Sequence, residues 1–306
     1  MKVALLNDLP VAGVLTSGFG SGAELSSGRF LWEGHRRGHI ADVVTPEYLH
    51  PGLLAQYDVV VTKNLTKFNN DQLAEITRHK YVAWPSDYMW NKWRLYFGFQ
   101  ESDRVRPETR EWEAFFTNSL FNVFLSPLHR ECHVWAMPKV ADHPYLDAPP
   151  AVNVDLFHPA KDGWTPNTAV NINGLLDFKG LKGHGGAAGN LDWAHANRGK
   201  QITFIGGSRE NVNLPGNAKF VGPKSQSEVA SILSLTETYF EFPMSPMPFD
   251  RTAVEGLLSC KRVETNRLCG AASYDWFKRA DRAAARDACR GGAAVIWERL
   301  QSEVSL

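Results

Sequence analysis

Short apolar runs alternate with longer stretches of helical periodicity along the first half of the chain. The apolar runs predict strands at residues 2–7, 40–45, 58–62, 81–84 and 122–126. Between them, helices are predicted at residues 23–37, 70–79 and 127–135, with partial helix within 88–116. Gly38, directly after the first helix, is typical of a helix C-terminus. Strands that alternate with helices in this way predict an α/β fold with a parallel, doubly wound sheet.

The second half of the chain repeats this alternation. Strands are predicted at residues 169–173, 201–205, 218–221, 239–242 and 262–265. Helices are predicted at residues 185–196 and 225–235, from 251 onward, and through most of 274–304. Pro149 and Pro150, with a polar run up to Pro166, mark a linker. We therefore expect two Rossmann-like domains, 1–160 and 161–306, with the terminal helix packing back on the first.

Composition limits the classes of protein that fit this pattern. A length of 306 residues is enough for two domains with a core each. The formal net charge of zero excludes a large basic surface that would hold a polyanion nonspecifically. Four cysteines without paired spacing indicate a reducing compartment, and neither a zinc site nor a disulfide scaffold. The chain shows no signal peptide and no apolar run of membrane-spanning length, so we expect a cytoplasmic protein without a transmembrane segment.

The stretch from Thr236 to Ala271 combines a strand, a loop with three prolines, the start of an amphipathic helix and a second strand. Open α/β sheets bind nucleotides at such a strand–loop–helix junction, where the strand order reverses. Asp250 is well placed as the helix N-cap. Glu255 follows within the first turns, where its carboxylate can accept two hydrogen bonds from a ribose diol. A surface helix with one solvated Glu is the alternative interpretation.

A glycine-rich loop precedes the first helix, with glycines at 18, 20 and 22. It does not follow the first strand directly and lacks the third glycine of a dinucleotide fingerprint, so a Rossmann dinucleotide site is not expected. A loop that leads into a helix N-terminus can still face an anion or a sugar. Gly20 and Gly22 are therefore candidate ligand contacts, with a loose surface loop as the alternative.

The stretch Met247-Pro248-Phe249-Asp250 through Glu255 resembles the donor-site signature of retaining glycosyltransferase family 4 (group 1). That signature places a Glu, a Phe-Gly loop and a second Glu at this spacing. The helix start at 22–24, the turn at 34–39 and the linker at 149–159 are also similar to family segments. The resemblance implies a GT-B fold, in which two Rossmann-like domains face a central cleft. The first domain would then bind the acceptor and the second the nucleotide-sugar donor.

The resemblance also implies which residues bind the donor. Lys179 fits a lysine that contacts the donor diphosphate, although a single turn lysine is usually only solvated. Gly206 and Gly207 fit a turn whose free N–H groups face the diphosphate. The implied donor-binding residues are Gly20, Gly22, Lys179, Gly206, Gly207, Pro248, Phe249 and Glu255.

Three signature positions differ from the family pattern. Leu175 replaces a phosphate-binding Arg, Met247 replaces the first Glu, and Asp250 replaces the Gly. Lys182 or Arg251 could supply the missing cation. These differences motivate an alternative function, that of a degenerate GT-B protein that binds a nucleotide-sugar or a protein partner without turnover.

Two carboxylates are candidate catalytic residues. Asp87 follows the fourth predicted strand, and the C-terminal ends of such strands face the ligand. Related enzymes carry a His where this chain has Ser86, which leaves Asp87 as the nearest group able to take a proton or orient an acceptor hydroxyl. Capping of the next helix is its alternative role. Asp250 is expected to reach sugar hydroxyls that Met247 cannot bind.

The implied reaction transfers a sugar from a nucleotide-sugar to an acceptor hydroxyl, with retention and without a metal. The sequence lacks the Asp-x-Asp motif of metal-dependent transferases. Helix N-termini, the glycine turn and Lys179 can neutralise the leaving diphosphate. We expect no cofactor, with a UDP-linked sugar as co-substrate. A nucleotide-sugar epimerase of the same fold is supported by no residue.

The acceptor stays open among a small molecule, a glycan or lipid-linked sugar, a protein and a modified nucleic-acid base. Basic and aromatic residues interleave over 93–112, which fits either a local groove for an extruded base or an ordinary solvated face. His129, Cys132 and His133 are close in sequence but lack the second half of a metal-binding motif. We expect these three residues to be structural.

Overall fold

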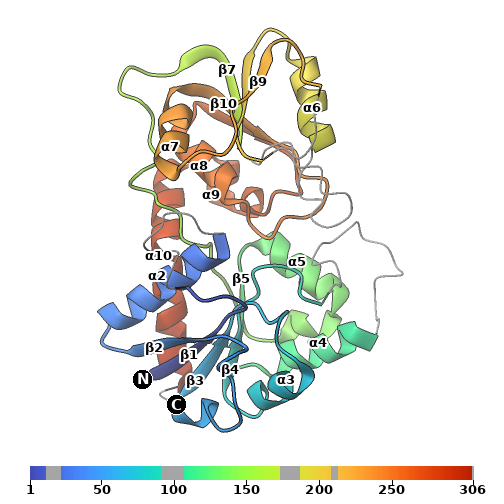
Figure 1. Cartoon of the computed structure of the whole chain (residues 1–306), viewed down its shortest axis with the longest axis vertical. Coiled ribbons are helices and arrows are strands. Elements are labelled where there is room, and N and C mark those ends of the chain that lie inside the picture. The colour runs from blue at the N-terminus through green and yellow to red at the C-terminus, as the bar shows by residue number, and fades with distance from the viewer. Residues whose placement is uncertain (12–21, 91–106, 173–186, 208–212, 305–306) are drawn as a thin grey trace. The chain divides into compact units, whose positions relative to one another are not determined.

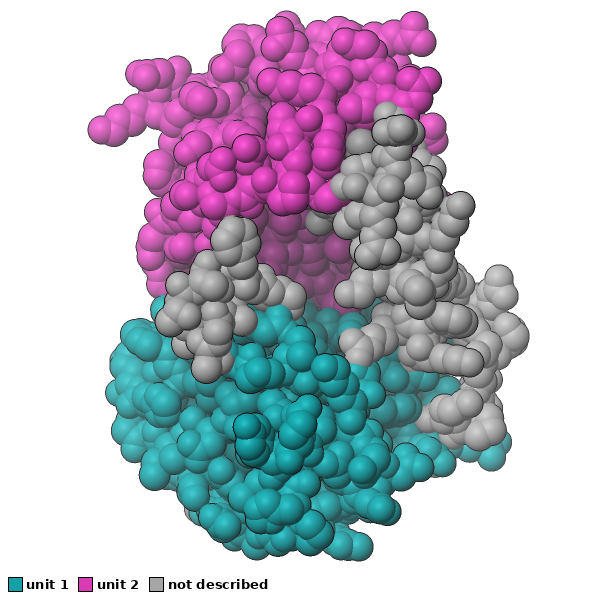
Figure 2. All heavy atoms as spheres, in the orientation of Figure 1, with its two compact units in different colours: residues 1–94, 99–151, 291–306 teal, residues 95–98, 152–290 magenta. Residues whose placement is uncertain are grey.

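The computed structural model describes residues 1–11, 22–90, 107–172, 187–207 and 213–304 (Figure 1). The chain forms two compact units, coloured separately in Figure 2. Unit 1 contains residues 1–94, 99–151 and 291–306, and unit 2 contains residues 95–98 and 152–290. The assignment of an acceptor role to the first domain and a donor role to the second stays a prediction.

Unit 1 is built on six parallel strands in the order β2-β1-β3-β4-β5-β6. The strands are β1 Lys2–Leu6, β2 Ile40–Val44, β3 Val59–Thr62, β4 Tyr81–Ala83, β5 Asn122–Phe124 and β6 Tyr145–Asp147. The helices are α2 Gly22–Arg36, α3 Asn70–Ile76, α4 Pro107–Asn118 and α5 Pro127–Ala136, with 3₁₀ turns η1 Leu54–Gln56 and η3 Pro138–Asp142. β2 pairs with one side of β1, and β3, the next strand along the chain, pairs with the other side. This reversal of strand order places a topological switch point between β1 and β3.

Unit 2 is built on five parallel strands in the order β11-β10-β7-β8-β9. The strands are β7 Thr165–Asn171, β8 Gln201–Phe204, β9 Ala218–Phe220, β10 Thr236–Glu241 and β11 Arg262–Thr265. The helices are α6 Ala187–Ala196, α7 Gln226–Leu235, α8 Arg251–Ser259, α9 Asp275–Lys278 and α10 Arg282–Val304, with the 3₁₀ turn η4 Gly270–Ser273. Strand order reverses between β7 and β10, so unit 2 has its own switch point there.

Both sheets confirm the predicted α/β class and doubly wound topology. Central strands of a parallel sheet are covered on both faces, and the residues of β3 are accordingly all buried. Two strands differ from prediction because their residues are solvated. β7 begins at Thr165, ahead of the apolar residues that define its predicted start, and its first three residues are exposed. β6 carries one exposed and two half-buried residues, so no apolar run indicates it.

The last turns of α10 belong to unit 1. Trp297 is fully buried and stacks on Phe30 of α2 with 4.7 Å between ring centroids. Its indole Nε1 donates to the Phe30 carbonyl at 2.8 Å. Gly34, one turn further along α2, leaves room for the ring, because a Cβ there would overlap Trp297. Among the described helices, none combines the length and hydropathy needed to cross a membrane.

Candidate functional site

Two buried polar side chains meet at the switch point of unit 2. Asn171 ends β7 and Glu241 ends β10, the neighbouring strand, and both are fully buried. The Asn171 Nδ2 donates to Glu241 Oε2 at 2.6 Å and to the Phe240 carbonyl at 2.9 Å. Buried polar groups at the carboxyl ends of parallel strands mark the position where open α/β sheets bind ligands. The sequence analysis did not single out either residue.

The helix α8 follows β10. Burial raises the pKa of the Cys269 thiol, and the charges of Asp250, at the start of α8, and of Glu241 raise it further. Asp250 is the N-cap of α8, as predicted, with its backbone in the left-handed region at φ 71°. Asp250 Oδ1 accepts from the Ala253 amide at 3.1 Å and from the Thr252 hydroxyl at 2.7 Å. Its other oxygen, Oδ2, lies 3.9 Å from the Cys269 sulfur. Burial raises the pKa of Asp250, and these hydrogen bonds oppose the shift.

The Asp250→Ala variant should lose about 1–2 kcal/mol of folding free energy, because α8 loses its cap. Asp250→Asn keeps an acceptor at the cap and tolerates the left-handed backbone, so its stability should be close to wild type. If Asp250 also binds the sugar, the Asn variant will hold an intact UDP-sugar more weakly than wild type while holding UDP equally well. Urea unfolding and calorimetric titration together measure both effects. Equal UDP-sugar affinity in Asp250→Asn would limit Asp250 to capping.

Glu255 lies inside α8 and is only 6% exposed. Burial is the largest influence and raises its pKa to about 7, with the negative charge of Asp250 adding to the rise. The Arg251 guanidinium opposes this shift and lies 3.9 Å from Glu255 Oε1. A carboxylate that changes its charge near neutral pH is characteristic of a functional site. The predicted role of Glu255 as a ribose acceptor stays a prediction.

The other predicted donor residues occupy different environments. Gly206 follows β8 with φ 130°, and its amide donates to the Gly222 carbonyl at 3.1 Å, so this N–H is not free for a diphosphate as expected. Gly207 is half-buried beside it. Phe249 is buried and its ring lies edge-on to Tyr274, whereas Pro248 is half-buried.

The three remaining predicted donor residues are Gly20, Gly22 and Lys179. Gly20 and Lys179 lie outside the described residues. Gly22 is the first residue of α2. Their donor contacts therefore stay predictions.

Asp87 lies in unit 1, just beyond the C-terminal end of β4, and is half-buried. The wholly buried ring of His129 on α5 accepts a hydrogen bond from the Leu125 amide at Nδ1, 3.2 Å away. Burial lowers the pKa of His129 well below its usual value; the charge of His133 lowers it further, whereas a hydrogen bond to the Asp87 backbone opposes the shift. His129 is thus a neutral ring packed against the Asp87 loop. Asp87 and Glu255 lie in different units.

The predicted structural role of His129, Cys132 and His133 agrees with their packing. All three are fully buried, and both histidine rings contact Tyr88 and Phe124. Within the described part of the chain, no group of three or more His, Cys, Asp or Glu side chains could hold a metal ion.

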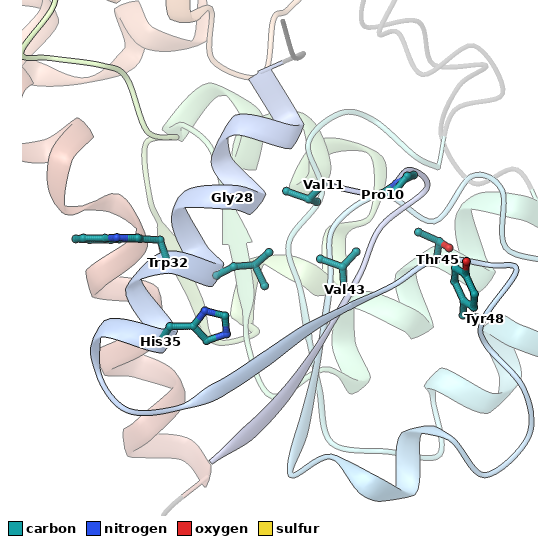
Figure 3. A pocket seen from close by; sticks show the side chains of 9 residues that line it. Pro10, Val11, Gly28, Trp32, His35, Val43, Thr45 and Tyr48 are labelled. Atoms are coloured by element: carbon teal, nitrogen blue, oxygen red, sulfur yellow. The ribbon is translucent and has the colours of Figure 1, made fainter. Parts of the chain in front are cut away.

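Unit 1 also contains an apolar recess of about 480 Å³ between α2 and the end of β2. Figure 3 shows His35 on one side and Tyr48 on the other, with Val43 between them. The recess is lined by Pro10, Val11, Gly28, Leu31, Trp32, His35, Val43, Thr45 and Tyr48. None of these is a predicted site residue.

No protein-family model matches the chain, and no curated protein matches its sequence. Solved structures do match. The Anabaena protein HepE in complex with UDP aligns with a TM-score of 0.60 at 12% identity, covering 100% of each chain. Sucrose-phosphate synthase from Thermosynechococcus elongatus gives 0.61 at 14% identity, over 99% of this chain and 97% of the other. Both are GT-B glycosyltransferases.

This chain has the GT-B fold. An alpha-glucosyltransferase in complex with UDP and a 13-mer DNA also matches, with a TM-score of 0.55 at 10% identity over 100% of both chains. At these identities the likeness establishes the GT-B fold alone, which confirms the fold implied by the sequence resemblance.

Proposed function

We propose that this protein is a glycosyltransferase that moves a sugar from a UDP-linked donor to an acceptor hydroxyl, without a metal and with retention. The observation that carries the proposal is Glu255, a buried carboxyl near the switch point of unit 2 that titrates close to neutral pH. The GT-B neighbours add support: HepE structures contain UDP, UDP and glucose, or UDP-glucose.

In the proposed mechanism the ionised Glu255 accepts hydrogen bonds from the two ribose hydroxyls of the donor. The N-terminus of α8 supplies a positive partial charge to the diphosphate, together with Lys179 and Gly207. The sequence carries no arginine at position 175, and Arg251, in the first turn of α8, would supply the missing cation. Asp87 orients the acceptor hydroxyl. The acceptor class is left to experiment.

Calorimetric titration with UDP, GDP and ADP tests the donor site directly. Wild type should bind UDP, and Glu255→Ala should bind it at least about tenfold more weakly, equivalent to about 1.4 kcal/mol. Glu228→Gln is a matched control, because Glu228 is an exposed capping residue of the same unit whose hydrogen bonds from Ser225 a Gln can keep. If none of the three nucleotides binds, the proposed function is refuted. Sugar transfer to candidate acceptors is measured by mass spectrometry with a labelled donor. UDP binding without transfer to any of these acceptors would favour the degenerate alternative.

The Asp87→Asn variant should lower turnover about tenfold, or about 1.4 kcal/mol on the barrier, with little change in UDP affinity. The reason is that an amide keeps the size of the side chain but cannot take a proton. Steady-state kinetics and calorimetry measure the two quantities. Asp71→Asn, an exposed acidic residue of unit 1, is the control. Wild-type turnover in Asp87→Asn would make Asp87 structural.

A further inference from the structure

A lysine is buried at the switch point of unit 1. Lys63 directly follows β3, its amide donates to the Leu6 carbonyl at the end of β1, and its side chain is fully buried. The ammonium Nζ lies 3.3 Å from the centroid of the Trp84 ring. Among the described residues, no hydrogen-bond acceptor reaches this nitrogen. A buried ammonium without an acceptor costs several kcal/mol of folding free energy, so its presence calls for a functional reason.

The topology brings charged residues from three elements to this point. Glu24 is in the first turn of α2, which comes after β1, and it is buried. Asp87 lies beyond β4, whose neighbour is β3. The titratable side chains facing Lys63 are Glu24, Asp87 and, on α5, His129. Because His129 is neutral, the cluster contains one cation and two carboxylates.

The charges in this cluster act on one another. Burial lowers the pKa of Lys63 well below its usual value, whereas the negative charges of Glu24 and then Asp87 raise it. By reciprocity, the ammonium favours a negative charge on Asp87. An ionised Asp87 accepts a hydrogen bond from a hydroxyl, and a protonated Asp87 cannot take its proton. A cation at Lys63 therefore extends the pH range in which Asp87 can act.

We propose that Lys63 is a positioning residue that holds Asp87 in its ionised form at the acceptor side of the site. This inference rests on the proposed function, because it assigns Lys63 to the residue that orients the acceptor hydroxyl. It also explains why a costly buried charge is kept. The cation is placed where the strand order of unit 1 reverses, the position at which such sheets meet their ligands.

The test compares Lys63→Met with Lys63→Arg and with Lys67→Met, an exposed lysine four residues along the chain. Methionine fills a similar volume without charge, so Lys63→Met should fold at least as stably as wild type in urea. The acidic limb of its pH–rate profile should move up by about one pH unit, so its turnover should fall about tenfold at pH values below that limb. Lys63→Arg keeps the positive charge, so under conditions in which it folds its acidic limb should lie at the wild-type pH. Lys67→Met should match wild type in stability, turnover and pH profile. A Lys63→Met enzyme with wild-type turnover and pH profile would overturn the proposal, as would one that loses activity only through unfolding.

A second measurement does not depend on turnover. The ¹³Cε resonance of Lys63, assigned by its absence in Lys63→Met, reports the ionisation of the amine as pH is varied. In Asp87→Asn and in Glu24→Gln its midpoint should fall by about one pH unit, because each variant removes a negative charge. An unchanged midpoint in Asp87→Asn would overturn the proposal even if the enzyme transfers sugar. A lowered midpoint in a protein that transfers none would refute the proposed function and leave the Lys63–Asp87 coupling established.

Discussion

UDP should bind this protein about thirtyfold more weakly at pH 5.5 than at pH 8, because its ribose needs the ionised form of Glu255. Burial raises the pKa of Glu255 to about 7, so acidification protonates it within this range. Affinity falls on acidification because the raised pKa of Glu255 places its protonation between pH 8 and pH 5.5. The ionised fraction falls from about nine-tenths at pH 8 to about one-thirtieth at pH 5.5, and a ligand that needs that form loses affinity in proportion. Calorimetric titration at half-unit steps of pH measures the midpoint.

The nucleotide itself titrates in the same region, since a terminal phosphate has a second pKa of about 6. Glu255→Gln isolates the contribution of the nucleotide phosphate, because a Gln side chain does not ionise. The difference between the wild-type and Glu255→Gln pH profiles belongs to the carboxyl group. Two identical profiles would show that UDP does not depend on the charge of Glu255, and the ribose contact would have to be sought elsewhere.

Trp297→Ala should destabilise unit 1 by about 3–5 kcal/mol, the usual range for removing a buried tryptophan. The substitution removes the stack on Phe30, the contact with His39 and the hydrogen bond to the Phe30 carbonyl. Because a two-unit protein need not unfold in one step, the effect is best measured locally. Hydrogen exchange of the β1 and β3 amides should accelerate more than that of the β7 and β10 amides.

Trp32→Ala provides the control. Trp32 lies on the same helix as Phe30, but its side chain is 48% exposed and carries the Arg29 guanidinium over its ring. Its removal should cost no more than about 1 kcal/mol. If Trp297→Ala and Trp32→Ala had similar effects on exchange, the end of α10 would not contribute to the core of unit 1.

The fold was predictable from sequence where burial imposes a repeating pattern. The apolar strand Val59–Thr62 and the capped start of α8 at Asp250 are both found as predicted. β6 gives no such signal, since parallel pairing with β5 stabilises it while its side chains stay partly solvated.

The site was less predictable, because the family signature directs attention to the α8 loop. Lys63 and Glu241 were missed, although Lys63 is a charged residue directly after an apolar strand run and Glu241 is a charged residue within one. A charged residue in such a place could have been recognised from sequence alone. Which strands form the switch point depends on strand order, and a single sequence does not reveal that order. The hydrogen bond of the Gly206 amide was likewise not predictable from sequence, because its acceptor lies sixteen positions away.

Unit 1 also has a consequence for how the protein is made. Phe30 leaves the ribosome well before its partner, because the hydrogen bond from Trp297 to Phe30 joins residues 267 positions apart. Residues of unit 2 are synthesised in between. At about 5–20 residues per second, the nascent unit 1 waits on the order of ten seconds or more with the Phe30 ring lacking its partner. A chain truncated before residue 291 should therefore require chaperone assistance that the chain of 306 residues, once released, does not.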